Sequence, residues 1–252
     1  MSVVFSVERL SKSFGGLTVN HEISLGMAPG ERLALIGPNG AGKTTFVNLV
    51  TGRLRPSQGE VLLGGEDITA VSAVGRVRRG LVRTFQVTRL FSEMTPEEHV
   101  LMALLQRAGR ATRILARFRG DAALRDEAAD ILATLGLLDV ARRPVAEIAY
   151  GQQRLLEIAI AMAQHPKVLL LDEPAAGVPS SDTPLIERAL ERLPAELAVL
   201  MIEHDMDLVF RFAKRVVVLA AGELIFQGLP GEVARDEKVR EAYLGSYAHA
   251  GR

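Results

Sequence analysis

The segment that most constrains the fold is Gly37-Pro38-Asn39-Gly40-Ala41-Gly42-Lys43-Thr44, which matches the phosphate-binding loop pattern G-x-x-x-x-G-K-[S/T]. The apolar run at 32–36 predicts a short buried strand before it, and 45–50 predicts the start of a helix that ends near Gly52. The glycines allow backbone N–H groups to surround phosphate oxygens, and the helix N-terminus adds its positive end. Strand, loop and helix together predict a site for nucleotide phosphates.

The end of this loop carries two side chains with predicted roles. Lys43 can reach the β- and γ-phosphates of a nucleotide, and the Thr44 hydroxyl can hold Mg²⁺. A chance Gly-rich turn is the alternative, which the flanking strand and helix disfavour. The residues predicted to bind the nucleotide are Gly37, Pro38, Asn39, Gly40, Ala41, Gly42, Lys43, Thr44 and Thr45.

Composition excludes several function classes. The chain has 252 residues, with 30 Lys+Arg against 30 Asp+Glu, so we expect no nucleic-acid partner. It contains no Cys, which excludes disulfides and thiolate metal sites. The N-terminus lacks the pattern of a signal peptide, and no apolar run reaches the ~20 residues of a membrane span. We therefore expect a soluble chain.

The order of predicted elements favours an α/β domain. Strands are expected at 3–10, 17–25, 60–63 and 81–85, and again at 168–171, 197–202 and 216–219, with helices between the later ones. Thr95-Pro96-Glu97-Glu98 predicts a helix start, and helices follow to about 138 and over 150–164. We expect a mostly parallel sheet with helices on its faces. The predicted division of this single domain is a nucleotide-binding core at 1–92 and 165–228, a helical lobe at 93–164 and a C-terminal helical tail at 229–252.

A second motif supplies carboxylates. The apolar strand at 168–171 ends in Asp172-Glu173. A phosphate-loop ATPase needs a carboxylate there to hold Mg²⁺, directly or through water, and Asp172 suits that role. Glu173 is the candidate general base that orients the attacking water. The alternative is a buried strand that meets a surface acidic turn, which the phosphate loop upstream disfavours.

The segment Ile148-Ala149-Tyr150-Gly151-Gln152, followed by Gln153-Arg154-Leu155-Leu156-Glu157-Ile158-Ala159, resembles the signature motif of ATP-binding cassette (ABC) ATPases. The order of motifs is also that of the family: phosphate loop, Gln86, signature, Asp172-Glu173 and then Ile202-Glu203-His204-Asp205. The resemblance covers nearly the whole chain. It implies a phosphate-loop ATPase core with an antiparallel β subdomain and an inserted helical lobe.

The resemblance also implies roles for individual residues. Phe14 would stack on adenine, with a plain core residue as the alternative. Gln86 would contact Mg²⁺ or the attacking water, with a solvated strand end as the alternative. His204 would contact the γ-phosphate, with a simple helix entry as the alternative; Asp205 can be the N-cap of that helix in both cases. The signature residues Ala149, Tyr150, Gly151 and Gln152 would point the N-terminus of their helix at the γ-phosphate of a second cassette, so that two chains close head to tail around two ATP molecules. The implied metal-binding residues are Thr44, Gln86 and Asp172.

Two departures from the family pattern narrow the resemblance. Ala149 stands where the signature usually has Ser, and Pro179 where the family commonly has Asp. The segments at 149–153, 173–177, 202–206 and 242–245 resemble the cassette of bacterial branched-chain amino acid importers. Cassettes of urea and amide importers and of a lipopolysaccharide exporter are similar. A non-transport ABC protein and a generic phosphate-loop kinase or GTPase are the alternatives from other classes.

The importer reading implies several partners. These are a second cassette, transmembrane permease subunits and, indirectly, a periplasmic solute-binding protein, which would place the chain peripherally on the cytoplasmic face of the inner membrane. The basic stretch from Arg107 to Arg119 is the remaining unexplained feature. We interpret it as a solvated helical face, with an amphipathic segment near anionic lipid as the alternative.

Overall fold

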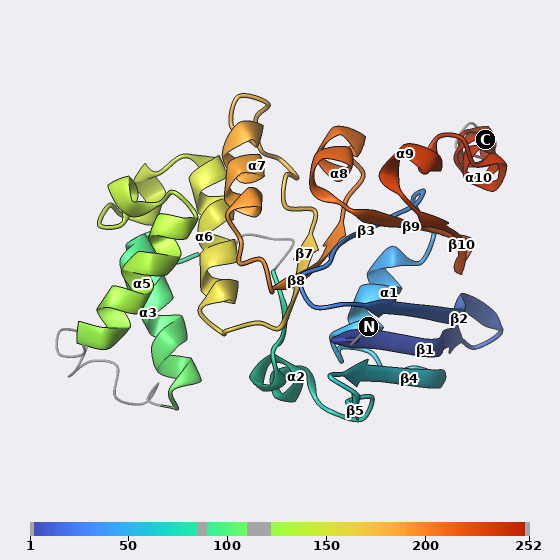
Figure 1. Ribbon diagram of the computed structural model, residues 1–252, viewed down its shortest axis with the longest axis horizontal. Helices are drawn as coiled ribbons and strands as arrows, with labels where there is room; N and C mark the ends of the chain where they lie inside the picture. The colour runs from blue at the N-terminus through green and yellow to red at the C-terminus, as the bar shows by residue number, and fades with distance from the viewer. Residues whose placement is uncertain (1–2, 85–89, 110–121, 250–252) are drawn as a thin grey trace. The chain divides into compact units, whose positions relative to one another are not determined.

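The computed structural model describes residues 3–84, 90–109 and 122–249. The chain divides into two compact units (Figure 1). The first unit contains Met1–Leu81, Lys167–Leu171 and Ala195–Arg252, and the second contains Val82–Pro166 and Asp172–Pro194. The division into core, helical lobe and tail expected from the sequence stays a prediction.

An antiparallel sheet forms part of the first unit, with the strand order β2-β1-β4-β5. Its strands are β1 (Phe5–Phe14), β2 (Leu17–Met27), β4 (Gln58–Leu63) and β5 (Glu66–Asp67). The pairing of Phe14 with Leu17 closes a tight hairpin at Gly15-Gly16, where Gly15 has a φ of +59° that a glycine adopts without strain. Most inward positions of β1 and β2 are apolar, as half-buried strands require, but two of them carry the buried polar residues Ser11 and Asn20.

The second sheet has six strands in the order β10-β9-β3-β8-β7-β6. They are β3 (Arg32–Ile36), β6 (Leu81–Arg83), β7 (Val168–Asp172), β8 (Ala198–Ile202), β9 (Arg215–Ala220) and β10 (Glu223–Gly228). β3 pairs in parallel with β8 and β9, whereas β9 and β10 form an antiparallel hairpin. The central strands are buried along their whole length, which explains their continuous Val, Leu and Ile runs.

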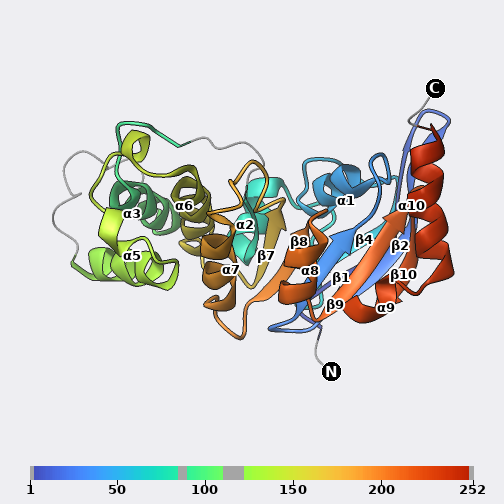
Figure 2. The same ribbon diagram turned by 90° about the horizontal axis from the view of Figure 1, so that it is seen from above.

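One apolar core joins the two sheets within the first unit. Its buried members come from β1, β2 and β4, from β3, β8 and β9, and from α1 (Lys43–Val50), the helix that follows the phosphate loop. The other helices of this unit are α2 (Ala73–Arg79), α8 (Met206–Phe212), α9 (Pro230–Val233) and α10 (Glu237–His249). Figure 2 shows α10 beside β10, which it contacts. The core therefore fixes β3 and α1, and with them both ends of the loop.

The second unit is built from helices. These are α3 (Pro96–Arg107), α5 (Ala122–Thr134), α6 (Tyr150–Met162) and α7 (Thr183–Glu191), with short 3-10 turns at Leu138–Val140 and Val145–Glu147. The predicted start of α3 is confirmed, because the Thr95 hydroxyl accepts from the Glu98 N–H and the Glu98 carboxylate accepts from the Thr95 N–H. The expected fold class, an α/β phosphate-loop core with an antiparallel subdomain and a helical lobe, is confirmed.

The interpretation of the basic stretch as a solvated face is wrong for Arg107. Its guanidinium makes a two-pronged ion pair with Glu127 of α5, at 2.7 and 2.9 Å, and donates to the Ala163 backbone oxygen at 2.8 Å. The pairing joins α3 to α5 because an Arg fork matches a carboxylate. The rest of the stretch lies largely outside the described residues. Within the described ranges, no helix is long and apolar enough to cross a membrane.

Candidate nucleotide-binding site

The phosphate loop has glycine where the backbone leaves no room for a side chain. Gly37 has a φ of +153°, and a Cβ on it would lie 2.0 Å from the Leu219 backbone oxygen of β9. Gly42 has a φ of +99°, and a Cβ on it would lie 2.6 Å from Nδ2 of Asn20 on β2. A Cβ on Gly40 would meet nothing within 4 Å, so this part of the loop faces open space. The loop is therefore packed against the sheets at its two ends and open in its middle.

The helix that follows the loop begins without a side-chain cap. Gly42 is the N-cap of α1, and no side chain accepts from the first N–H groups of the helix. Uncapped N–H groups at a helix N-terminus attract anions. Thr44 and Thr45 lie in this first turn, as the sequence predicts.

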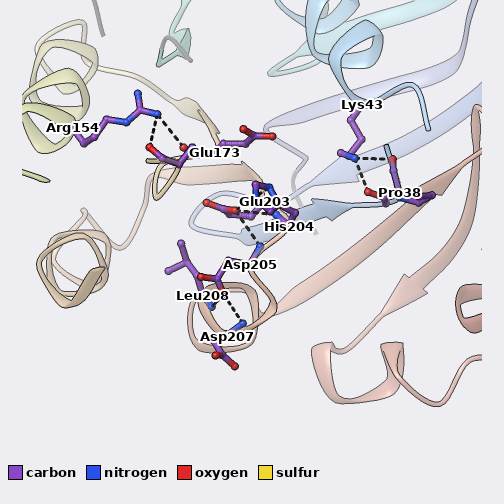
Figure 3. A network of polar contacts seen from close by, with 11 residues as sticks. Pro38, Lys43, Arg154, Glu173, Glu203, His204, Asp205, Asp207 and Leu208 are labelled. Carbon is purple, nitrogen blue, oxygen red and sulfur yellow. Dashed lines mark hydrogen bonds and ion pairs between the residues drawn. The ribbon is translucent and has the colours of Figure 1, made fainter. Parts of the chain in front are cut away.

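Lys43 folds over the same loop. Its Nζ donates to the backbone oxygens of Gly37, at 2.6 Å, and Pro38, at 3.0 Å (Figure 3). These bonds hold the ammonium group beside the open middle of the loop. The contact between this lysine and nucleotide phosphates stays a prediction.

The segment after β8 is held by two carboxylates (Figure 3). Glu203 is buried, and its Oε2 accepts from the N–H groups of His204, at 2.9 Å, and Asp205, at 3.3 Å. Asp205 caps α8 by accepting from the N–H groups of Asp207 and Leu208, which confirms the sequence prediction of its N-cap role. The His204 side chain is 69% exposed, so it is presented at the surface of the first unit.

Phe14 lies at the end of the β1–β2 hairpin. It is 49% exposed, so the alternative that it is a core residue is wrong. The Lys12 ammonium lies 5.1 Å from the centre of its ring, which is within the range of a cation–π contact. Stacking on adenine stays a prediction for this exposed ring.

In the second unit, Asp172 at the end of β7 is paired with Arg83. Arg83 Nη2 donates to Asp172 Oδ2, and both side chains are about nine-tenths buried. The Thr84 hydroxyl accepts from the Asp172 N–H at 3.3 Å. Arg83 of β6 thus holds the Asp172 carboxylate, and Thr84, which follows β6, holds the Asp172 backbone. Gln86 itself lies outside the described residues, and its predicted role is untested.

Glu173 stands in a strained backbone conformation. Its φ is +49°, in the left-handed region that a residue with a long side chain adopts at a cost of order 1–3 kcal/mol. Arg154 of α6 supports this turn, because its Nη2 lies 3.4 Å from the backbone oxygens of both Glu173 and Ala176 (Figure 3). Its Nη1 pairs with Glu157 at 2.8 Å in a buried ion pair. The helix that begins at the signature therefore contacts the turn that carries Glu173.

The signature residues form the start of α6. Ala149 is the N-cap, and Gln152 Oε1 accepts from its N–H at 3.0 Å. No side chain caps the N–H groups that follow, so the helix N-terminus is available to an anion. Tyr150 is 39% exposed, and its hydroxyl lies close to Gly177. Gly151 is buried against Asp182, the N-cap of α7.

Among the described residues, the structure brings the phosphate loop and His204 into the first unit, and Asp172, Glu173 and the signature into the second. Sequence reasoning assigned no role to Arg83, Arg154 or Asn20. Each of these side chains bonds to at least one residue 22 or more positions away, and Arg83 bonds to one 89 positions away. Arg83 and Arg154 lie within segments that the sequence analysis quoted, but no local pattern distinguishes a buried arginine from a solvated one.

Comparisons with known proteins identify relatives over almost the full length. The pattern that defines the ABC transporter family matches residues 20–176, and that of the branched-chain amino acid ATP-binding cassette transporter matches residues 223–249. The chain is 40% identical to the high-affinity branched-chain amino acid transport ATP-binding protein LivG of Escherichia coli K12, over 96% of this chain and 98% of that protein. Identity to BraF of Pseudomonas aeruginosa, which has the same description, is 39% over the same shares.

Similarity extends to a transporter of another kind and to solved structures. The lipopolysaccharide export system ATP-binding protein LptB of Haemophilus influenzae is 32% identical, over 96% of this chain and 97% of that protein. The ADP conformation of MJ1267, an ATP-binding cassette of an ABC transporter, superposes with a TM-score of 0.86 at 30% identity, over 97% of this chain and 100% of that one. A nucleotide-free cassette gives a TM-score of 0.83 at 28% identity, over 96% and 98%.

Proposed function

Since this chain belongs to the ABC transporter family and is an ATP-binding ATPase subunit of that family, we propose that it drives a bacterial importer of branched-chain amino acids. The observation that carries this proposal is the match of residues 223–249 to the pattern of branched-chain amino acid cassettes, which lies outside the general family match at 20–176. The identity to LivG and BraF over nearly whole chains supports it.

We propose that the nucleotide is ATP and that its phosphates lie in the phosphate loop. The open middle of the loop, the uncapped start of α1 and the Lys43 ammonium support this position. Helix N–H groups and a lysine together neutralise phosphate charge. Phe14 is available to stack on the adenine ring, where such a contact is worth about 1–3 kcal/mol.

We propose Mg²⁺ as the ion that accompanies the nucleotide. The Thr44 hydroxyl and the Asp172 carboxylate offer the oxygen donors that this ion prefers, and Gln86 would add an amide oxygen. No cluster of three or more His, Asp or Glu side chains that could hold a metal alone occurs in the described ranges. When bound, Mg²⁺ would neutralise charge on the β- and γ-phosphates.

The chain's own residues would then carry out hydrolysis. Glu173 would accept a proton from the attacking water or orient it, and His204 would contact the γ-phosphate. The N-terminus of α6, with Ala149, Tyr150, Gly151 and Gln152, would face the nucleotide of a second cassette. Two cassettes would close around two ATP molecules, and hydrolysis would reopen them. This cycle would move permease subunits fed by a periplasmic binding protein, with the cassette peripheral on the cytoplasmic face of the inner membrane.

Uptake of radiolabelled leucine, isoleucine and valine tests the proposed solute. Deletion of the chain should lower uptake, the parent sequence should restore it, and Glu173→Gln should not. Unchanged uptake of these solutes together with a defect in outer-membrane lipid delivery would favour a lipopolysaccharide exporter. This is the second candidate function, which the similarity to LptB supports. A defect confined to the uptake of urea or small amides would change the proposed solute and leave the proposed importer function in place. No transport defect of any kind would favour a non-transport ABC ATPase.

Assembly is tested by light scattering on purified protein. Glu173→Gln with ATP and Mg²⁺ should raise the dimer content, because bound ATP is retained between the cassettes, whereas the nucleotide-free protein should be mostly monomeric. A protein that stays monomeric with ATP, even after its natural partner cassette is added, would contradict the head-to-tail arrangement.

A further inference from the structure

Asn20 is a buried amide in β2 that contacts the phosphate loop. It is fully buried, and its Nδ2 donates to the Gly42 backbone oxygen at 3.3 Å. The direction of the amide follows from its partner, because a carbonyl oxygen only accepts and therefore meets the NH₂ side. The other end of the amide, Oδ1, has no hydrogen-bond partner among the described residues.

This arrangement is costly for the fold. A buried polar atom without a partner destabilises the folded state, and one neutral hydrogen bond on the other atom of the amide does not offset the whole cost of removing it from water. An apolar side chain of similar shape would fill the same place in the core without an unpaired acceptor. The amide at this position therefore needs an explanation other than stability.

The backbone of the loop supplies one. In a planar trans peptide unit, the carbonyl and the following N–H point in opposite directions. The Ala41 carbonyl accepts from the N–H of Gly222, in the β9–β10 turn, at 3.1 Å, which directs the Gly42 N–H the other way. The Gly42 carbonyl accepts from Asn20 and, at 2.9 Å, from the Phe46 N–H, which directs the Lys43 N–H the other way.

The two donors from outside the helix, Asn20 Nδ2 and the Gly222 N–H, come from segments that are hydrogen-bonded to each other. Gly222 also accepts from the His21 N–H at 2.9 Å, so the β9–β10 turn is bonded to β2 next to Asn20. A Cβ on Gly222 would lie 2.5 Å from the Val19 backbone oxygen, so only glycine allows this close approach. β2 and the turn thus hold consecutive carbonyls of the loop away from the side on which its N–H groups lie.

We propose that Asn20 is a positioning residue for ATP binding, which fixes the Gly42 carbonyl so that the Lys43 N–H faces a nucleotide phosphate. The inference rests on the proposed function of the loop. It predicts that removal of the amide separates two properties: nucleotide affinity falls, whereas stability without nucleotide does not.

The test replaces Asn20 by Leu, which keeps the branch at Cγ, and by Val as a second apolar variant in case Leu is not accommodated. The dissociation constant of fluorescent methylanthraniloyl-ATP and the thermal midpoint of the nucleotide-free protein are measured on each. We expect the dissociation constant to rise about three- to tenfold, the range for one hydrogen bond, with a midpoint equal to or above that of the parent.

Ser11→Ala is the matched control on the neighbouring strand β1. Ser11 is a buried polar residue whose hydroxyl accepts from the Glu22 N–H at 2.9 Å, and neither residue belongs to the loop. This variant should lower the midpoint and leave the dissociation constant within about twofold of the parent.

Three outcomes would overturn the proposal, and they are distinguishable. Parent-like affinity in both Asn20 variants would overturn the positioning role alone. The positioning role would also be overturned if the Asn20 variants lost nucleotide affinity only together with a lower thermal midpoint, because that would indicate a general weakening of the fold. Parent protein that binds no nucleotide, or binds it equally well after Lys43→Ala, would instead overturn the proposed function of the loop and this inference with it.

Discussion

The Nη1 of Arg76 donates to the backbone oxygen of Leu49 at 2.8 Å, and this bond joins α2 to the last turn of the helix that follows the phosphate loop. The same group donates to the Val50 oxygen, and the rest of the guanidinium donates to the oxygens of Thr69 and Val71. Arg76 is 1% exposed, and burial lowers its pKa below the ordinary value. A cation at the C-terminus of α1 complements the helix dipole.

Arg76→Met should therefore destabilise the protein. The substitution leaves buried carbonyl oxygens without a donor, and we expect the free energy of unfolding to fall by about 2–4 kcal/mol, as measured by urea unfolding. Arg79→Met on the same helix is the matched control, because Arg79 is 41% exposed and pairs with Glu66 at 3.1 Å. It should cost below ~1 kcal/mol. Equal losses in the two variants would show that the buried contacts of Arg76 are not what stabilises this region.

Glu173→Gln and Lys43→Ala should separate catalysis from binding. Loss of the Glu173 carboxylate removes the proposed base while the phosphate loop stays intact, so ATP binding should persist and steady-state hydrolysis should fall by at least about a hundredfold. Lys43→Ala removes the ammonium beside Gly37 and Pro38, so nucleotide affinity should fall. Nucleotide binding and phosphate release are measured on both. Full hydrolysis by Glu173→Gln would remove this residue from its role.

Local patterns made part of this molecule predictable from the sequence. The segment 32–50 contains the strand, the glycine loop and the helix in one continuous stretch of sequence. The helix caps at Thr95 and Asp205 are also short, continuous segments. The two caps depend on bonds between residues a few positions apart, so the sequence contains their whole signal. β3 instead pairs with β8 and β9 far along the chain, and only its apolar run made it predictable. The signature motif, and its order relative to the phosphate loop, Asp172-Glu173 and the segment at 202–205, was also enough to identify the family.

Contacts between distant segments were not predictable in the same way. Arg76 bonds to residues 26 and 27 positions away, and Arg154 to a residue 22 positions away. In the sequence, nothing distinguishes either of them from a solvent-exposed arginine. Asn20 is likewise one polar residue in a strand that alternates, and only the packing of β2 against the loop shows that it is buried.

Acid should destabilise the second unit through His99. This histidine is 2% exposed. Its Nδ1 donates to the Thr95 backbone oxygen at 2.9 Å, and its Nε2 accepts from the Phe91 N–H at 3.0 Å. Because Nε2 is an acceptor here, the ring is in its neutral form. Burial lowers its pKa below the ordinary value of 6.5. Since the unfolded chain binds the proton at higher pH than the folded chain, stability should fall as the pH drops below about 6.5.

The pH dependence is measured by urea unfolding at several values between about pH 7.5 and 5.5. His99→Gln should be less stable than the parent near neutrality and should lose part of the slope below pH 6.5. His21→Gln is the matched control, since His21 is 58% exposed. A slope that stays the same in His99→Gln would assign the acid sensitivity to other groups.

Substitutions of Gly151 at the start of α6 separate the effect of steric crowding from the effect of an added negative charge. A Cβ on Gly151 would lie 3.0 Å from the Asp182 Cβ and 3.2 Å from its Oδ2. Gly151→Ala should therefore cost some stability through crowding. Gly151→Asp should be far worse for hydrolysis, because it adds a negative charge beside Asp182 and faces the partner's γ-phosphate in the proposed dimer.

Ala149→Ser is the complementary change at the N-cap of the same helix. Ala149 has the extended backbone of an N-cap but no side-chain acceptor, so a serine hydroxyl should stabilise α6 by about 1 kcal/mol and raise the thermal midpoint. Hydrolysis in the assembled transporter should change by less than about tenfold, or about 1.4 kcal/mol in barrier, because in the proposed dimer the helix N–H groups would face the anion without the hydroxyl. If Ala149→Ser and Gly151→Asp both hydrolyse ATP at the parent rate, the N-terminus of α6 does not contact a nucleotide and the signature assignment is wrong.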